Sequence, residues 1–102
     1  MKRYPAAKVA VDDDGVLKLS GRIGYSNADG VLPIGRQALA NAVVTRIDLA
    51  GLEAPDSATL ALLLVWAAEA RRSQHPLVMS DPPEGLRALA RLANAEALLG
   101  FS

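Results

Sequence analysis

Residues 43–72 have the sequence VVTRIDLAGLEAPDSATLALLLVWAAEARR, in which a β-rich segment, a short loop and a long apolar segment follow one another. Val43 to Leu49 is rich in β-branched side chains and is bounded by Gly51, which predicts a strand buried on at least one face. Asp56-Ser57 is typical of a helix N-terminus, where a side-chain oxygen accepts a hydrogen bond from a free backbone N–H. We therefore predict a helix from Asp56-Ser57 to about Arg72.

The predicted helix is apolar on all sides, because no polar residue occurs from Leu60 to Ala68. One face follows helical spacing and is expected to cover a sheet: Leu60, Leu63, Leu64 and Ala67. Leu62, Val65 and Trp66 fall toward another face. Either a neighbouring helix or a partner protein covers that second face, and in the latter case Leu62 and Trp66 are partner-binding residues.

The residues before this segment predict a hairpin and a first helix. Lys8–Val11 and Val16–Ser20 alternate polar and apolar side chains around the turn residues Asp12-Asp13-Asp14-Gly15, which is typical of an antiparallel hairpin. Ser26-Asn27 is a candidate helix cap. Because Pro33 lies early in the segment that ends at Ala42, we expect the helix to be kinked or to start late.

The residues after the long helix predict one more strand and helix. Leu77–Met79 is expected to be a short strand that Pro76 precedes, and Asp81-Pro82-Pro83-Glu84 has the pattern of a helix start with Asp81 as N-cap. A final turn over Glu96–Leu99 ends at Gly100. The order of elements predicts a single α/β domain over 1–102, a sandwich in which about three helices lie on a mixed sheet of four to five strands.

Composition excludes several classes of protein. Eleven basic residues balance eleven acidic ones in 102 residues, which gives none of the basic excess that is usual in nucleic-acid-binding domains. A hydrophobic share of 51% with so little net charge excludes intrinsic disorder. The N-terminus has no secretory signal, and the longest apolar run is nine residues, whereas a membrane span needs about 20. We therefore expect a soluble, cytoplasmic protein without a membrane span.

Catalytic and metal chemistry have little support in the sequence. Cysteine is absent, and His75 is the only histidine, so it is expected to be a loop residue rather than a metal ligand or a base. Asp12-Asp13-Asp14 suits a solvated turn better than a cation site. We predict no enzyme, no metal and no cofactor. Ser57 has two readings: it caps the helix, or it is a phosphorylation site, since a helix N-terminus stabilises added negative charge.

The whole chain resembles the STAS domain family, the fold of anti-sigma-factor antagonists. The resemblance lies in Ile47-Asp48-Leu49-Ala50, in Asp56-Ser57-Ala58-Thr59-Leu60 with its Leu-rich helix, in Ser20-Gly21, and in Pro83 with Leu86, Leu89 and Leu92. Within the family the chain is most similar to the STAS subunit of Mla-type phospholipid ABC transporters, through Val31-Leu32-Pro33, Leu60–Leu64 and Leu89-Ala90-Arg91-Leu92.

That resemblance implies a non-enzymatic accessory subunit that binds the ATPase subunit of the transporter. The protein would be cytoplasmic and peripheral to the inner membrane through this partner. The implied contact centres on Asp56, Ser57, Ala58 and Thr59, extends along the helix to Leu62 and Trp66, and includes the loop 24–27.

Two departures from the family pattern leave an alternative open. Ala50 replaces a hallmark serine, and Thr59 replaces a hallmark glycine that gives a kinase close access to the serine. The alternative is an anti-sigma-factor antagonist whose partners are an anti-sigma factor and a serine kinase that phosphorylates Ser57; the β-branched Thr59 argues against it. A third class is a STAS module that binds a small molecule or lipid in a pocket beside the same loop.

Overall fold

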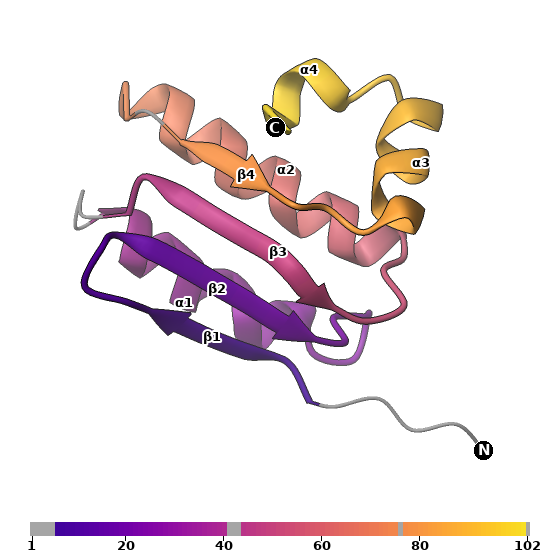
Figure 1. Cartoon of the computed structure of the whole chain (residues 1–102), viewed down its shortest axis with the longest axis horizontal. Coiled ribbons are helices and arrows are strands. Elements are labelled where there is room, and N and C mark those ends of the chain that lie inside the picture. The colour runs from indigo at the N-terminus through magenta and orange to yellow at the C-terminus, as the bar shows by residue number, and fades with distance from the viewer. Residues whose placement is uncertain (1–5, 41–43, 76, 102) are drawn as a thin grey trace.

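The computed structural model describes residues 6–40, 44–75 and 77–101 (Figure 1). They form a mixed four-stranded sheet with three main helices and one short one, an α/β arrangement that agrees with the expected fold class. In chain order the elements are β1 (Lys8–Val11), β2 (Val16–Gly21), α1 (Ala28–Ala40), β3 (Arg46–Leu52), α2 (Ser57–Arg72), β4 (Val78–Ser80), α3 (Glu84–Leu92) and α4 (Glu96–Leu99).

The sheet has the strand order β1-β2-β3-β4. β1 pairs with β2 antiparallel, so the predicted hairpin is confirmed, and its turn is held by Asp12 Oδ1, which accepts hydrogen bonds from the N–H groups of Asp14 and Val16. β2 with β3, and β3 with β4, are parallel pairs, as the two strand–helix–strand units predict. Figure 1 shows α1 and α2 side by side behind the sheet, and none of the described helices covers the opposite face.

β3 carries an irregularity that matters for the site at its end. The pairing shifts along β3, so that Lys18 is opposite Asp48 whereas Ser20 is opposite Gly51. Asp48 Oδ1 accepts a hydrogen bond from the N–H of Ala50 at 3.0 Å, which compensates for the disturbed ladder. A Cβ atom at Gly51 would lie 2.8 Å from the Cβ of Ser20, so this close approach requires glycine. β3 ends at Leu52 rather than Leu49, and Val43, the predicted first residue, lies outside the described residues.

The second face of α2 packs against α1 and is not free. Trp66 is 0% exposed, its Nε1–H donates to the carbonyl oxygen of Leu32 at 3.1 Å, and its ring lies against Gly35. Leu62 is only 4% exposed. The expectation that Trp66 is exposed to a partner is therefore wrong, because α1 covers it. Leu62 is also mostly buried but lines a hollow between α1 and α2, so its contact with a partner stays a prediction. Glycine at position 35 makes this possible, because it lets the indole approach the backbone of α1.

α1 begins at Ala28, directly after the candidate cap Ser26-Asn27 and five residues before Pro33. Of the two expectations, a kink or a late start, the late start is therefore wrong. The predicted end at Ala42 lies outside the described residues. Proline within the helix removes one backbone donor, which the helix tolerates here. The Asn27 side chain does not cap α1. Its Oδ1 accepts a hydrogen bond from the N–H of Gly24 and its Nδ2 donates to the carbonyl oxygen of Arg22, so it closes the preceding loop.

α3 also begins differently from the prediction. Its N-cap is Pro83 and not Asp81, and no side chain caps it. Asp81 has φ 56°, outside the helical region, and both Asp81 and Pro82 precede a proline, which disfavours helical backbone. β4 begins at Val78, one residue later than predicted, and Pro76 lies outside the described residues. α4 ends at Gly100, as expected, and Gly100 has the left-handed conformation that is common after a helix.

Candidate functional site

Two chain segments meet where the parallel strands β2 and β3 end. One is the loop between β2 and α1, residues 22–27; the other is the first turn of α2 with its cap, residues 56–59. We call these two segments together the Ser57 surface. The predicted residues Asp56, Ser57, Ala58 and Thr59 all lie in it.

Asp56 is the N-cap of α2. Its Oδ1 accepts hydrogen bonds from the N–H groups of Ala58 at 2.9 Å and Thr59 at 3.2 Å. Thr59 Oγ1 in turn accepts from the N–H of Asp56 at 3.1 Å, which completes a reciprocal capping box. Capping at this helix start is therefore confirmed, with Asp56 as the capping residue. The first turn of α2 is fixed, since three backbone donors near the helix start have partners.

Thr59 also connects the helix to the loop. Its side chain is 0% exposed and its hydroxyl donates to the carbonyl oxygen of Ile23 at 2.9 Å. The sequence places a β-branched side chain near Ser57, but in the structure this side chain is buried beneath the surface that Ser57 occupies. Asp-x-x-Thr at a helix start was the available signal for the capping role; the bond to Ile23 has no signal in the sequence.

Ser57 is exposed at the first position of α2. Its Oγ lies 3.3 Å from the hydroxyl oxygen of Tyr25, whose side chain is 81% exposed. Arg22 Nη2 lies 3.8 Å from Asp56 Oδ2 at the edge of the surface. The surface thus presents two hydroxyl groups and an aromatic ring, with a cation and an anion at its rim.

The described residues around Ser57 do not form the arrangement that a serine nucleophile requires. A serine nucleophile needs a base within hydrogen-bond reach, and Ser57 Oγ has only the Tyr25 hydroxyl among the described side chains. His75 lies after the far end of α2, where its Nε2 contacts the carbonyl oxygen of Val44. Within residues 6–40, 44–75 and 77–101, no three potential ligands among His, Cys, Asp and Glu are grouped as a metal site requires.

A shallow apolar hollow of about 220 Å³ adjoins Ser57 between α1 and α2. Its lining is Tyr25, Ala28, Asp29, Leu32, Ala58, Ala61, Leu62 and Val65. Leu62 therefore lies beside the Ser57 surface, in the wall of this hollow, whereas Trp66 is buried in the core. The sequence predicted a contact through the loop 24–27 but did not single out Tyr25, although an aromatic ring in a polar loop was an available signal.

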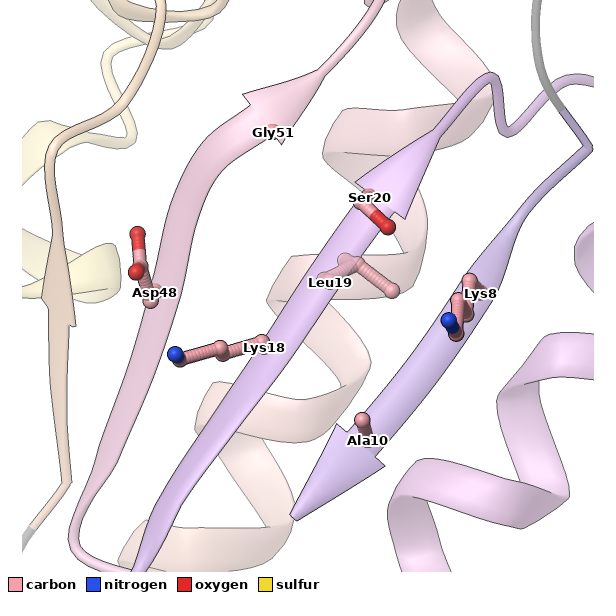
Figure 2. Close-up of a pocket in the computed structure, with 7 residues that line it drawn as sticks. All are labelled: Lys8, Ala10, Lys18, Leu19, Ser20, Asp48 and Gly51. Atoms are coloured by element: carbon pink, nitrogen blue, oxygen red, sulfur yellow. The ribbon is translucent and has the colours of Figure 1, made fainter. Parts of the chain in front are cut away.

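A second hollow, of about 320 Å³, lies on the open face of the sheet and is separate from the Ser57 surface (Figure 2). Lys8, Lys18, Ser20 and Asp48 border it, and its floor contains the close approach of Ser20 and Gly51. Figure 2 shows Lys18 extending from β2 toward β3.

In the described part of the chain, no helix is both long and apolar enough to cross a bilayer.

Comparison with known proteins identifies the family and the fold. The family model described as "Mlab, STAS domain" matches residues 6–100. No curated protein is similar enough to the chain to count as a match.

Three solved structures have a similar fold. SpoIIAA, an anti-sigma factor antagonist, in its unphosphorylated form has a TM-score of 0.71 at 16% identity, over 95% of this chain and 88% of that one. A putative anti-sigma factor antagonist from Thermotoga maritima has a TM-score of 0.72 at 18% identity, over 93% and 84%. The Bacillus cell fate determinant SpoIIAA in its phosphorylated form has a TM-score of 0.69 at 13% identity, over 95% and 91%.

Proposed function

The chain belongs to the Mlab-type STAS domain family, and from this premise we propose that it is a non-enzymatic accessory subunit of a Mla-type phospholipid ABC transporter. It binds the cytoplasmic ATPase subunit of that transporter through the Ser57 surface and is peripheral to the inner membrane through this partner. The observation that carries the proposal is the exposed Ser57–Tyr25 hydroxyl pair on a fixed helix start, in a chain matched to this family from residue 6 to residue 100.

The chemistry of the Ser57 surface supports protein binding. Exposed tyrosine is enriched among the residues that dominate interface energies, and Tyr25 is beside an apolar hollow that a partner side chain can fill. The two hydroxyl groups can donate to or accept from a partner's backbone. The charged rim is small, and the chain has no net charge, so docking depends on shape and apolar contact more than on long-range attraction.

Photo-crosslinking tests which partner this surface meets. Ala61 is exposed and lines the hollow, so a benzoylphenylalanine in its place is expected to form a covalent adduct with the ATPase subunit in cells. The control is the same photoreactive residue at Ala97, which is exposed on α4, away from the Ser57 surface. Adducts are identified by mass spectrometry. An equally strong ATPase adduct from position 97, or none from position 61, contradicts the proposed surface.

A second candidate function is that of an anti-sigma-factor antagonist switched by phosphorylation. The exposure of the Ser57 hydroxyl at the N-terminus of a 16-residue helix favours it, since the helix dipole stabilises negative charge there. The test is to incubate the protein with ATP and the serine kinase whose gene lies nearest to its own. Peptide mass spectrometry then shows whether Ser57 carries a phosphate. A phosphate on Ser57 that is absent from the Ser57→Ala variant supports this candidate. An unmodified Ser57 excludes regulation of this protein through phosphorylation by that kinase.

A further inference from the structure

The loop between β2 and α1 contains neither a helix nor a strand, yet it carries Tyr25, whose side chain is 81% exposed on the Ser57 surface. We infer that Thr59 is the positioning residue of this surface: its buried hydroxyl holds the loop against α2 so that Tyr25 stands beside Ser57. The consequence is that a partner meets one preformed surface and not two segments that move independently. This consequence rests on the proposed function.

The first step is that one hydroxyl group forms a hydrogen bond with the backbone of each segment. Thr59 Oγ1 donates to the carbonyl oxygen of Ile23 and accepts from the N–H of Asp56. Thr59 and Ile23 are both 0% exposed, so water has no access to replace the bond between them. A buried carbonyl group that loses its donor carries the full cost of its desolvation, which makes this bond stronger than an exposed one.

The second step concerns two further polar contacts between the loop and α2, both of which are exposed or partly exposed. The Tyr25–Ser57 hydroxyl contact is at the surface, and the Arg22–Asp56 pair has a separation of 3.8 Å with both side chains partly exposed. Exposed pairs of this kind contribute little to fixing a conformation. The side chain of Asn27 orders the loop internally, through its bonds to Gly24 and Arg22. Among these polar contacts, the buried Thr59–Ile23 bond is therefore expected to contribute most to the placement of the loop, which the side chain of Ile23 also anchors in the core.

The third step concerns affinity. If the partner contacts Tyr25 and Ser57 together, only loop conformations that place Tyr25 beside Ser57 are competent to bind. The apparent dissociation constant rises in proportion as the competent fraction falls. Without the Thr59 hydroxyl, a loop that spends one tenth of its time in place would bind about tenfold more weakly. Glycine, the hallmark residue of the family at this position, has no side chain for such a bond, so Thr59 gives this chain a restraint of its own.

The test compares Thr59→Val, which keeps the β-branched shape and removes the hydroxyl, with Thr59→Ser, which keeps the hydroxyl. Amide hydrogen exchange over residues 22–27, the melting temperature, and the Kd for the ATPase subunit are measured for both. We expect Thr59→Val to accelerate exchange in the loop and to raise Kd about tenfold, and Thr59→Ser to restore both toward the wild type. A Thr59→Val protein that melts earlier but binds and exchanges like the wild type shows a merely structural role and overturns the inference.

A double substitution shows whether Thr59 acts through Tyr25. In a Tyr25→Ala background the positioned ring is gone, so adding Thr59→Val is expected to change Kd less than twofold, against about tenfold in the wild-type background. Additive effects on Kd overturn the inference. If the wild-type protein binds no ATPase, the proposed function fails; hydrogen exchange of the Thr59 variants then still decides whether Thr59 holds the loop.

Discussion

Gly35→Ala is expected to lower the free energy of unfolding by about 3 kcal/mol, although it adds a single methyl group. A Cβ atom at Gly35 would overlap the six-membered ring of Trp66, which is completely buried between α1 and α2. The indole has to move, and its hydrogen bond to the Leu32 carbonyl oxygen is strained or lost. For a domain of about 100 residues this corresponds to a fall in melting temperature of more than about 10 °C.

Gly30→Ala is the matched control, because Gly30 is in the same helix and a Cβ atom there meets nothing within 4 Å. Replacing this glycine is expected to leave stability unchanged or to raise it by about 0.5 kcal/mol, as alanine has the better helix propensity. Thermal unfolding followed by the fluorescence of Trp66, the only tryptophan of the chain, measures both variants. Equal melting temperatures for the two would show that Gly35 is not required for the contact of α1 with Trp66.

The same contact shows what sequence patterns can and cannot predict about this fold. Period-two alternation located β1 and β2, and Asp56-Ser57 located the start of α2, because these signals arise from neighbours in the chain. Helical spacing placed Trp66 and Leu62 on one face of α2 but could not say what covers that face. The covering depends on Gly35, 31 positions before Trp66, and on the close approach of two helices, which no local pattern encodes.

The candidate site was predictable to a similar degree. Asp56 to Thr59 followed from the helix start, and the resemblance to the STAS family added the loop 24–27. The hydroxyl contact between Tyr25 and Ser57 joins residues 32 positions apart, and the Thr59–Ile23 bond joins residues 36 apart. Such contacts depend on how β2 and β3 pair, including the irregularity opposite Ser20, so they became visible only in three dimensions.

Ser57→Arg is expected to weaken binding to the ATPase subunit by at least about 100-fold while the domain remains folded. Ser57 is exposed and its side chain takes no part in the capping box of Asp56 and Thr59, so the fold does not depend on it. Arginine at this position places a long, charged side chain between Tyr25 and the partner. It also puts a positive charge at the positive end of the α2 dipole, which costs about 0.5 kcal/mol of stability.

Ser73→Arg is the control for a long cation on the same helix, since Ser73 is exposed and follows the opposite end of α2. The most direct measurement is the Kd of the purified ATPase subunit for the wild-type protein, Ser57→Arg and Ser73→Arg, each with its melting temperature. Binding through the Ser57 surface predicts an unchanged Kd for Ser73→Arg and no measurable binding for a folded Ser57→Arg protein. A folded Ser57→Arg protein that binds the ATPase as tightly as the wild type would contradict the proposal.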